Sequence, residues 1–331
     1  MARLDGYHRP IDYLRVSVTD RCNLRCVYCM PEEGVSSCTH SDILRFEEIE
    51  LVVRAAASLG IRQVRLTGGE PLARLGIVDL VRMLAQVPGI DDLSMTTNGT
   101  LLARHAEALR EAGLNRVNVS LDTLCPDRYR AITRRGQLQD ALDGIEAAHR
   151  AGLEPVKINA VIIRDLNDDE VVDLARLSVT KGWHVRFIEW MPVGDDARMA
   201  DAWHGHTVTA AEMREQVTAA LGPLEPAILE VGAGPARYYR LSGASGTLGF
   251  ITPLSEHFCG QCNRLRLTAD GQLRPCLLSS YEIDLRTPLR EGAEESEIAS
   301  LLAQGIDEKP ARHHLDENDQ VRDRAMSQIG G

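Results

Sequence analysis

The sequence predicts an α/β fold in which six strand–helix units build a parallel sheet, curved into a partial (β/α)6 TIM-type barrel. Segments typical of strands alternate with segments of helical periodicity over about residues 11–190, which indicates right-handed crossovers between parallel strands. Six units are fewer than the eight of a complete barrel. The predicted strands span residues 12–18, 61–67, 91–97, 114–122, 154–163 and 183–190.

Polar side chains on one face of these strands favour a barrel over an open sheet. Arg15 and Ser17 lie two positions apart, and Lys157 and Asn159 repeat this spacing. The same alternation is found for Arg65 and Thr67 and for Asn118, Ser120 and Asp122. A parallel sheet covered by helices on both faces would be apolar throughout, so we expect an interior that holds a polar ligand. The alternative is an edge strand or a solvated face.

Segments of helical periodicity separate the predicted strands. The predicted helices span residues 47–60, 101–113, 138–152 and 169–182. The first three end at a glycine, which commonly follows the last turn of a helix. Asp168 is expected to cap the N-terminus of the fourth helix.

The alternating pattern ends near residue 190. Residues 192–236 are rich in Gly, Pro and Ala and contain one predicted helix, near 209–221. Residues 237–275 predict short antiparallel strands with a hairpin turn at 269–271, and residues 283–304 predict helix. We therefore expect two domains: a barrel over residues 1–235 and an α+β extension over residues 236–331.

The composition excludes several classes of protein. The net charge of −11 argues against general binding to nucleic acid or membrane surfaces. No apolar run is long enough to span a bilayer, and the first ten residues lack the apolar core of a secretory signal. We expect a cytoplasmic protein, in which clustered cysteines indicate metal or redox sites rather than disulfides.

Three of the 8 cysteines follow the first predicted strand directly. Cys22, Cys26 and Cys29 have the spacing C-x3-C-x2-C. Three thiolates in one loop can bind three irons of a [4Fe–4S] cluster and leave the fourth iron open, and an open position is typical of a catalytic metal. A zinc site with a distant fourth ligand and three unrelated cysteines are the alternatives.

This motif, with Tyr28 before its last cysteine, resembles the radical S-adenosylmethionine (SAM) enzymes. The resemblance implies a [4Fe–4S] cluster whose open iron binds SAM, and an electron from the cluster that cleaves SAM to a 5′-deoxyadenosyl radical. It also implies the partial six-unit barrel. The segment "LTGGEPL" after the second strand and "NVSLD" in the fourth match family segments. The residues that the resemblance assigns to SAM are Tyr28, Gly68, Gly69, Glu70, Ser120 and Met191.

A second group of three cysteines lies near the C-terminus. Cys259, Cys262 and Cys276 have the spacing C-x2-C-x13-C. They indicate either a second open Fe–S cluster or a structural zinc site with His257 as the fourth ligand. Cys38 and Cys125 are isolated, and we interpret them as ordinary small side chains.

The second group occurs in "CNRLRLTADGQLRPCL", and the chain ends in Gly330 and Gly331. Together with the barrel, these features resemble the MoaA family of GTP 3′,8-cyclases, lyases of molybdenum cofactor biosynthesis, over nearly the whole chain. The resemblance implies that the radical removes hydrogen from C3′ of GTP and that this carbon then bonds to C8 of guanine. It implies that guanine binds at the open iron of a second [4Fe–4S] cluster, and that the Gly-Gly end supports turnover.

Basic residues on the strands suit a triphosphate, because guanidinium groups form paired hydrogen bonds to phosphate. Lys157 is one of only three lysines among 37 basic residues, and it lies in the middle of a predicted strand. Its alternative role is that of an edge lysine that blocks aggregation. The residues predicted to bind the nucleotide are Arg15, Arg65, Thr96, Lys157, Arg264, Leu265 and Arg266.

The resemblance also implies partners. These are GTP, an electron donor of the flavodoxin or ferredoxin type, the next enzyme of the pathway (cyclic pyranopterin monophosphate synthase) and a second copy of the chain. Two rival interpretations remain at this point: another radical SAM enzyme with two clusters, such as a peptide maturase, and a zinc-containing binding or regulatory protein.

Overall fold

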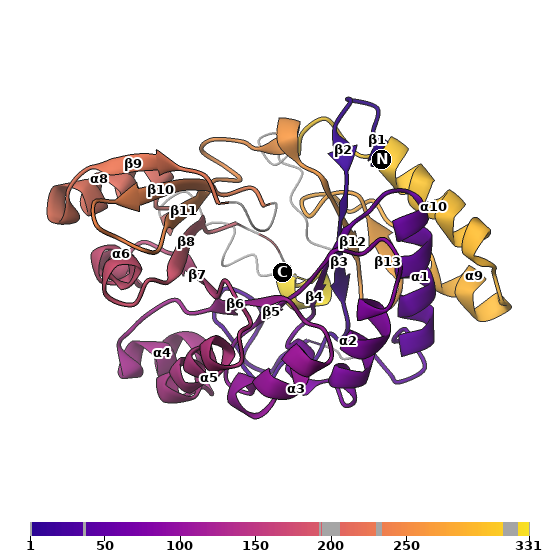
Figure 1. The fold of residues 1–331 in the computed structure, drawn as a ribbon, viewed down its shortest axis with the longest axis horizontal. Helices are drawn as coiled ribbons and strands as arrows, with labels where there is room; N and C mark the ends of the chain where they lie inside the picture. The colour runs from indigo at the N-terminus through magenta and orange to yellow at the C-terminus, as the bar shows by residue number, and fades with distance from the viewer. Residues whose placement is uncertain are drawn as a thin grey trace.

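The computed structural model describes residues 2–35, 38–191, 193, 206–229, 234–313 and 324–330. Its centre is a set of parallel strands that curve into an open barrel with helices on the outside (Figure 1). The barrel strands are β3 (Tyr13–Ser17), β4 (Gln63–Thr67), β5 (Asp92–Thr97), β6 (Arg116–Ser120), β7 (Lys157–Ile162) and β8 (His184–Glu189). The predicted fold class and all six predicted strands are confirmed.

The helices outside the barrel are only partly as predicted. They are α1 (Phe46–Ser58), α2 (Ile77–Ala85), α3 (Ala106–Glu111), α4 (Pro126–Thr133), α5 (Leu138–Arg150) and α6 (Val171–Thr180). α1 and α5 match their predictions closely. The sequence does not predict α2 and α4, which have nine and eight residues and give short periodic patterns. The predicted helix 101–113 is interrupted, because a 3-10 turn, η2 (Leu102–Arg104), precedes α3.

The predicted N-terminal cap of the fourth helix is wrong. Asp168 begins a 3-10 turn, η3 (Asp168–Glu170), and Glu170 occupies the cap position of α6 without a capping side-chain bond. The carboxylate of Asp168 instead accepts a hydrogen bond of 2.8 Å from the backbone N–H of Asp165. Asp168 therefore stabilises the turn that precedes α6 and does not cap the helix.

The C-terminal strands extend both edges of the barrel into one sheet of 12 strands. At one edge β12 (Arg264–Leu267) pairs in parallel with β3, and at the other β11 (Leu248–Ile251) pairs in parallel with β8. Antiparallel strands follow: β13 (Gln272–Arg274) and β14 (Ile283–Asp284) beside β12, and β10 (Arg237–Leu241) and β9 (Leu224–Ala227) beside β11. The antiparallel prediction for residues 237–275 holds for the pairs β10–β11 and β12–β13. It misses the two parallel pairings with the barrel, and β9 and β14 lie outside the residues predicted to form strands.

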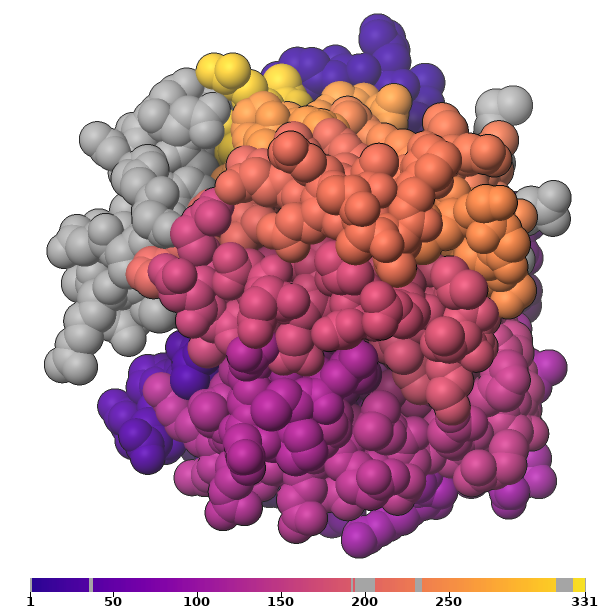
Figure 2. All heavy atoms as spheres, turned by 90° about the vertical axis from the view of Figure 1, so that its left-hand side faces the viewer, coloured from indigo at the N-terminus to yellow at the C-terminus, as the bar shows by residue number. Residues whose placement is uncertain are grey.

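The remaining elements lie outside the sheet. They are α8 (Ala210–Leu221), α9 (Arg286–Glu291), α10 (Glu295–Asp307), the short pair β1 (Arg3–Leu4) and β2 (Pro10–Ile11), and the 3-10 turns η1 (Pro71–Ala73), η4 (Cys259–Gln261) and η6 (Met326–Gln328). In Figure 2, α8 and the nearby strands, in orange, continue the surface of the barrel helices, in magenta. None of the described helices is long and apolar enough to cross a membrane.

The hydrophobic core lies between the strands and the helices. Alternate residues of the strands, such as Leu14, Val64 and Leu66, are fully buried there together with Val52 and Val53 of α1. The strand residues between them point to the barrel interior, because successive side chains of a strand face opposite sides. The core thus fixes which polar residues meet inside the barrel.

Gly144 allows α5 to pack closely against the loop after β5. A Cβ atom at this position would lie 2.2 Å from the carbonyl oxygen of Gly99. In an exposed helix, Gly→Ala would stabilise by up to about 1 kcal/mol. Here we expect Gly144→Ala to lower the free energy of unfolding by about 1–3 kcal/mol, because backbone atoms must move apart.

Urea denaturation of the variant and the parent chain measures this change. Asp143→Ala, at the exposed neighbouring position, is the control and should shift stability by no more than about 0.5 kcal/mol. A Gly144→Ala variant as stable as the parent would contradict the close packing.

Candidate active site

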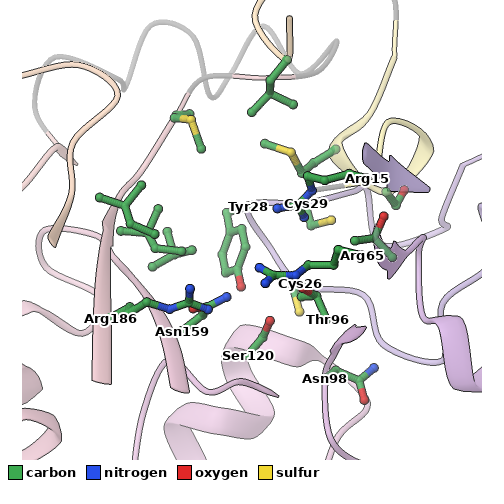
Figure 3. Close-up of a pocket in the computed structure, with 18 of the residues that line it drawn as sticks. Arg15, Cys26, Tyr28, Cys29, Arg65, Thr96, Asn98, Ser120, Asn159 and Arg186 are labelled. Atoms are coloured by element: carbon green, nitrogen blue, oxygen red, sulfur yellow. The ribbon is translucent and has the colours of Figure 1, made fainter. Parts of the chain in front are cut away.

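The barrel interior forms a cavity to which all six barrel strands contribute (Figure 3). Its polar wall residues from β3 to β8 include Arg15, Arg65, Thr67, Thr96, Ser120, Asn159 and Arg186. Arg15, Arg65, Thr67, Ser120 and Asn159 among them lie on the strand faces predicted to be polar. The expected polar interior is therefore present, and the alternative of a solvated face is wrong for these residues.

The first three cysteines line one end of this cavity. Cys22, Cys26 and Cys29 lie in the loop after β3, at the carboxyl end of the parallel strands, where barrel enzymes place their active sites. All three are free thiols. Burial raises the pKa of Cys22 to about 11 and that of Cys29 to about 12. Thiolates in this position need a nearby positive charge, which iron supplies.

Neighbouring groups hold the cysteine loop in place. The backbone N–H groups of Arg25 and Val27 each donate a 3.0 Å bond to the last turn of α4. Arg134, just after α4, donates to the carbonyl oxygens of Arg25 and Met30.

The sulfur of Cys22 accepts hydrogen bonds from the backbone of Leu24 and the amide of Asn98. Donors of this kind stabilise a metal-bound thiolate, so the loop fits a cluster with three protein ligands.

The two predicted SAM-binding glycines lie where β4 meets the cysteine loop. A Cβ atom at Gly68 would lie 2.5 Å from the carbonyl oxygen of Thr19, and one at Gly69 would lie 2.4 Å from that of Arg21. The N–H of Gly69 donates to Thr19 at 2.7 Å. Both glycines line the cavity, and their lack of side chains lets this segment pack closely against the backbone of residues 19–21, just before Cys22.

Glu70 is buried behind the cavity wall rather than lining it. Its carboxylate accepts hydrogen bonds from the hydroxyl of Thr97 (2.7 Å) and from the backbone N–H groups of Leu72 (3.0 Å) and Asn98 (2.7 Å). Burial raises its pKa to about 7 against these three donors. The contacts join the loops after β4 and β5. The other predicted SAM residues, Tyr28, Ser120 and Met191, all line the cavity.

Three arginines form a row across the sheet. Arg266 on β12 is the register partner of Arg15 on β3, which is the partner of Arg65 on β4. All three line the cavity. Burial and mutual repulsion lower the pKa of Arg15, and burial lowers that of Arg65 to about 10 and that of Arg266 to about 9. Like charges opposite one another destabilise a sheet, so a negatively charged ligand would stabilise this row.

Arg186 on β8 adds a further cation that the sequence analysis did not single out. It is the register partner of Asn159 on one side and of Gly249 on the other. A Cβ atom at Gly249 would lie 2.9 Å from Cγ of Arg186, so the glycine makes room for the arginine. Arginine alternates with Val185 and Phe187 in the sequence, and that signal could have identified it.

Two predicted nucleotide residues do not line the cavity. Leu265 is fully buried in the hydrophobic core, on the opposite face of β12 from Arg264 and Arg266. Lys157 is buried, and burial, then Arg186 and other arginines, lower its pKa to about 6. The edge-strand alternative for Lys157 is wrong, because β7 lies between β6 and β8.

The second three cysteines line an adjoining cavity. It contains Cys259, Cys262 and Cys276 and shares part of its wall with the first, including Arg264 and Arg266. Burial raises the pKa of Cys262, but Arg264 and Lys309 outweigh it and lower the pKa to about 6. The surroundings therefore favour thiolate at Cys262, whereas burial raises the pKa of Cys259 as it does at the first site.

His257, the suggested fourth zinc ligand, is engaged elsewhere. Its Nδ1 lies 2.8 Å from the carbonyl oxygen of Pro253 and 3.1 Å from Nε2 of His313. Within the described part of the chain, no three Cys, His, Asp or Glu side chains are arranged around a single metal ion.

The last described residues, up to Gly330, lie inside the barrel (Figure 1). The carbonyl oxygen of Gly330 accepts hydrogen bonds from Arg15 (3.1 Å) and Arg266 (2.9 Å). The backbone of Ser327 donates a hydrogen bond to Cys29. A Cβ atom at Gly330 would lie 2.6 Å from Oγ1 of Thr67, at a positive φ of 71°. Gly331 lies outside the described residues.

Several buried polar atoms around the cavity have no hydrogen-bond partner within the described residues. They are Oγ1 of Thr96, Oδ1 of Asn159, Nε of Arg186, the hydroxyl of Tyr13 and both side-chain polar atoms of Asn118. Buried polar groups are normally satisfied. Their concentration here indicates a polar ligand in the barrel.

The Thr97 hydroxyl gives a pH-dependent test of the Glu70 contacts. The folded-state pKa of Glu70, about 7, exceeds its ordinary 4.5, so folding becomes less favourable as the pH rises through this range. Thr97→Val removes a donor that binds the ionised carboxylate more strongly than the neutral one. We expect a loss of about 1.5–3 kcal/mol near pH 8.5 but only about 0.5–1.5 kcal/mol near pH 5.5.

Urea denaturation at the two pH values measures the difference. Thr96→Val is the matched control, because the Thr96 hydroxyl has no partner within the described residues. Its effect should be small and equal at both pH values. An equal loss at both pH values for Thr97→Val would contradict the stabilisation of ionised Glu70.

Comparisons with known proteins agree with this architecture. Residues 16–178 match the family model described as Radical SAM superfamily, and residues 183–315 match the one described as Molybdenum Cofactor Synthesis C. The GTP 3′,8-cyclase of Pelotomaculum thermopropionicum is 60% identical over 99% of both chains. That of Heliobacterium modesticaldum is 54% identical over 99% of this chain and 100% of its own.

The solved structure of Streptococcus suis SuiB bound to S-adenosylmethionine has a TM-score of 0.59 at 16% identity. It covers 87% of this chain and 68% of SuiB, and it supports the fold alone. Full-length identity at this level, together with the radical SAM match over the barrel, excludes the zinc-containing regulator. The chain belongs to the GTP 3′,8-cyclase family of the radical SAM superfamily, whose members use SAM and a [4Fe–4S] cluster.

Proposed function

We propose that this chain is a GTP 3′,8-cyclase that converts GTP to 3′,8-cyclo-7,8-dihydro-GTP in molybdenum cofactor biosynthesis. Cys22, Cys26 and Cys29 would hold the [4Fe–4S] cluster that binds SAM. Cys259, Cys262 and Cys276 would hold a second [4Fe–4S] cluster. Curated cyclases similar to this chain over almost their full length support the activity.

The excess of positive charge inside the barrel is the observation that carries the substrate assignment. Arg15, Arg65, Arg186, Arg264 and Arg266 all line the cavity, in a chain with a net charge of −11. The cavity lining contains two carboxylates, Asp122 and Glu189, within the described residues. Both already accept hydrogen bonds from neighbouring protein groups. A triphosphate supplies the missing negative charge and suits guanidinium donors.

The residues of the chain would orient and enclose the substrate. The row of Arg15, Arg65 and Arg266 would bind phosphate, and Arg264 would direct the base toward the second cysteine site. Cys22, Cys26 and Cys29 would hold the cluster that, with SAM bound, would supply the radical chemistry for removing hydrogen from C3′. Holding C3′ and C8 of one GTP molecule close together favours the bond between them over competing reactions. The ring-closed radical would then take up one electron from the external reductant and one proton to give the dihydro product, and the barrel walls would limit access of water to the reacting carbons.

The partners follow from the family assignment and belong to the same proposal. A one-electron carrier of the flavodoxin or ferredoxin type would reduce the first cluster. The cyclised product would pass to cyclic pyranopterin monophosphate synthase, and the chain would act as a homodimer.

GTP deuterated at C3′ tests the substrate and the atom attacked. The protein with both clusters reconstituted is incubated without oxygen with SAM, dithionite and labelled GTP, and products are followed by mass spectrometry. We expect deuterium in 5′-deoxyadenosine and a cyclised GTP product. Deoxyadenosine without deuterium or cyclised product would contradict GTP as the substrate.

Variants of the two cysteine sites separate their roles in the same assay. Cys22→Ser should abolish SAM cleavage, whereas Cys259→Ser should lose cyclisation and retain some uncoupled cleavage. Cys125→Ser, at an exposed cysteine, is the control and should behave like the parent. Cyclisation at the parent rate by Cys22→Ser or Cys259→Ser would contradict the corresponding site.

Lys157 does not line the cavity, but its amine interacts electrostatically with Arg186, which does, and we expect this to make GTP binding depend on pH. Its amine, with a pKa of about 6, is mostly neutral in the free protein above that pH. A bound triphosphate favours the charged amine, so binding takes up a proton and GTP affinity falls as the pH rises from about 6 to about 8.5.

Calorimetric titration across this pH range measures the effect. Lys157→Met should bind GTP about tenfold more weakly near pH 6 and show a shallower pH dependence. Lys181→Met, at an exposed lysine, should match the parent. An unchanged slope in Lys157→Met would contradict coupling between this amine and the nucleotide.

A further inference from the structure

An arginine anchors the C-terminal segment before it enters the barrel. The guanidinium of Arg324 donates to both carboxylate oxygens of Asp270 at 3.1 and 2.9 Å. It also contacts both oxygens of Glu282, at 3.0 and 2.8 Å. The three side chains are only 18–19% exposed. Although burial lowers the pKa of Arg324, the two carboxylates raise it overall. This contact, the Arg324 clamp, is stronger than an ordinary surface ion pair.

The clamp holds the segment to the strands that carry the second cysteine site. Asp270 lies in the turn between β12 and β13, and Glu282 directly precedes β14. Glu282 also pairs with Arg274 of β13, whose side chain is fully buried. The carboxylates are therefore fixed by the sheet, and Arg324 is the member of the group that belongs to the C-terminal segment.

The segment is fixed a second time six residues later. Between Arg324 and Gly330 it forms the turn η6, and Ile329 is fully buried. The carbonyl oxygen of Gly330 then meets Arg266, which lies on the same β12–β13 hairpin as Asp270, and Arg15 beside it. Because both ends are bound to one rigid hairpin, the path between them has a defined length and direction.

We propose that Arg324 is a positioning residue that sets how far the C-terminal segment reaches into the barrel. The clamp determines that Ser327 meets Cys29 and that Gly330 meets the arginine row. This inference rests on the proposed function, because those two contacts join the cluster site to the phosphate site. In the free protein the Gly330 carbonyl occupies donors of Arg15 and Arg266, so an incoming triphosphate displaces it while the clamp keeps the segment close.

Loss of the clamp has a direct physical consequence. Without Arg324, Glu282 keeps Arg274 as a partner and Asp270 keeps its hydrogen bond with Thr268. The six-residue segment then loses its ion pairs to the hairpin and keeps the contacts of Ser327 and Gly330 at its far end. The barrel strands and both cysteine groups are held by other contacts and should stay intact. The effect should therefore appear in the segment and in the coupling of SAM cleavage to cyclisation, not in cluster content.

Hydrogen exchange of the reconstituted enzyme tests the clamp without relying on turnover. In Arg324→Gln, amides of residues 326–330 should exchange at least about tenfold faster than in the parent, with iron content unchanged. Arg324→Lys keeps the charge but loses the paired geometry, so it should be intermediate. Arg290→Gln, which breaks another arginine contact to a buried carboxylate, is the control and should leave these amides protected.

Turnover gives the second measurement. In Arg324→Gln, the amount of cyclised product per 5′-deoxyadenosine should fall about tenfold, and Asp270→Asn should act in the same direction. Unchanged exchange and coupling in both variants would overturn the proposal, as would equal changes in Arg290→Gln. A parent enzyme that forms no cyclised GTP would contradict the proposed function instead, and hydrogen exchange would still decide the role of the clamp.

Discussion

The burial of Arg15, Arg65 and Arg266 in register on three adjacent strands is the constraint on which the cavity depends. Burial lowers the pKa of all three, and nearby arginines lower each further: Arg266 and Arg65 act on Arg15, Arg186 on Arg65, and Arg264 on Arg266. The opposite faces of the same strands carry fully buried apolar residues that secure the sheet. The strain of the charge row is therefore tolerated in the free protein and relieved by an anionic ligand.

The open barrel determines how the two cysteine sites come together. A closed barrel would leave no free edge beside β3, whereas here β12 pairs with that edge and brings Arg264 and Arg266 into the cavity. Residues 258–277 are thereby placed next to the loop that contains Cys22, Cys26 and Cys29, about 230 residues earlier in the chain. Periodicity identifies β12 as a strand but says nothing about its partner, because parallel pairing depends on contacts far apart in sequence. For the same reason, the division into domains 1–235 and 236–331 stays a prediction.

The sequence predicted the site best where a residue's role follows from its spacing. The six cysteines, Arg15, Arg65 and Ser120 line the cavities because loop position and strand alternation determine which way they point. Leu265 and Glu70 were taken from family segments, and alternation places Leu265 in the core while three donors hold Glu70 behind the wall. Short helices such as α4 were missed, because one or two turns give too little periodicity.

The two cysteine sites differ in the charge that surrounds them, and this difference suits different tasks. At the first site burial raises the pKa of all three thiols, so thiolate there depends on the metal itself. At the second, Arg264 and Lys309 favour thiolate at Cys262, and the same cations extend into the arginine row. The arginine row lines the same cavity as Cys22, Cys26 and Cys29, so positive charge is continuous between the two cysteine sites. The C-terminal segment contacts Cys29 through Ser327 and the arginine row through Gly330.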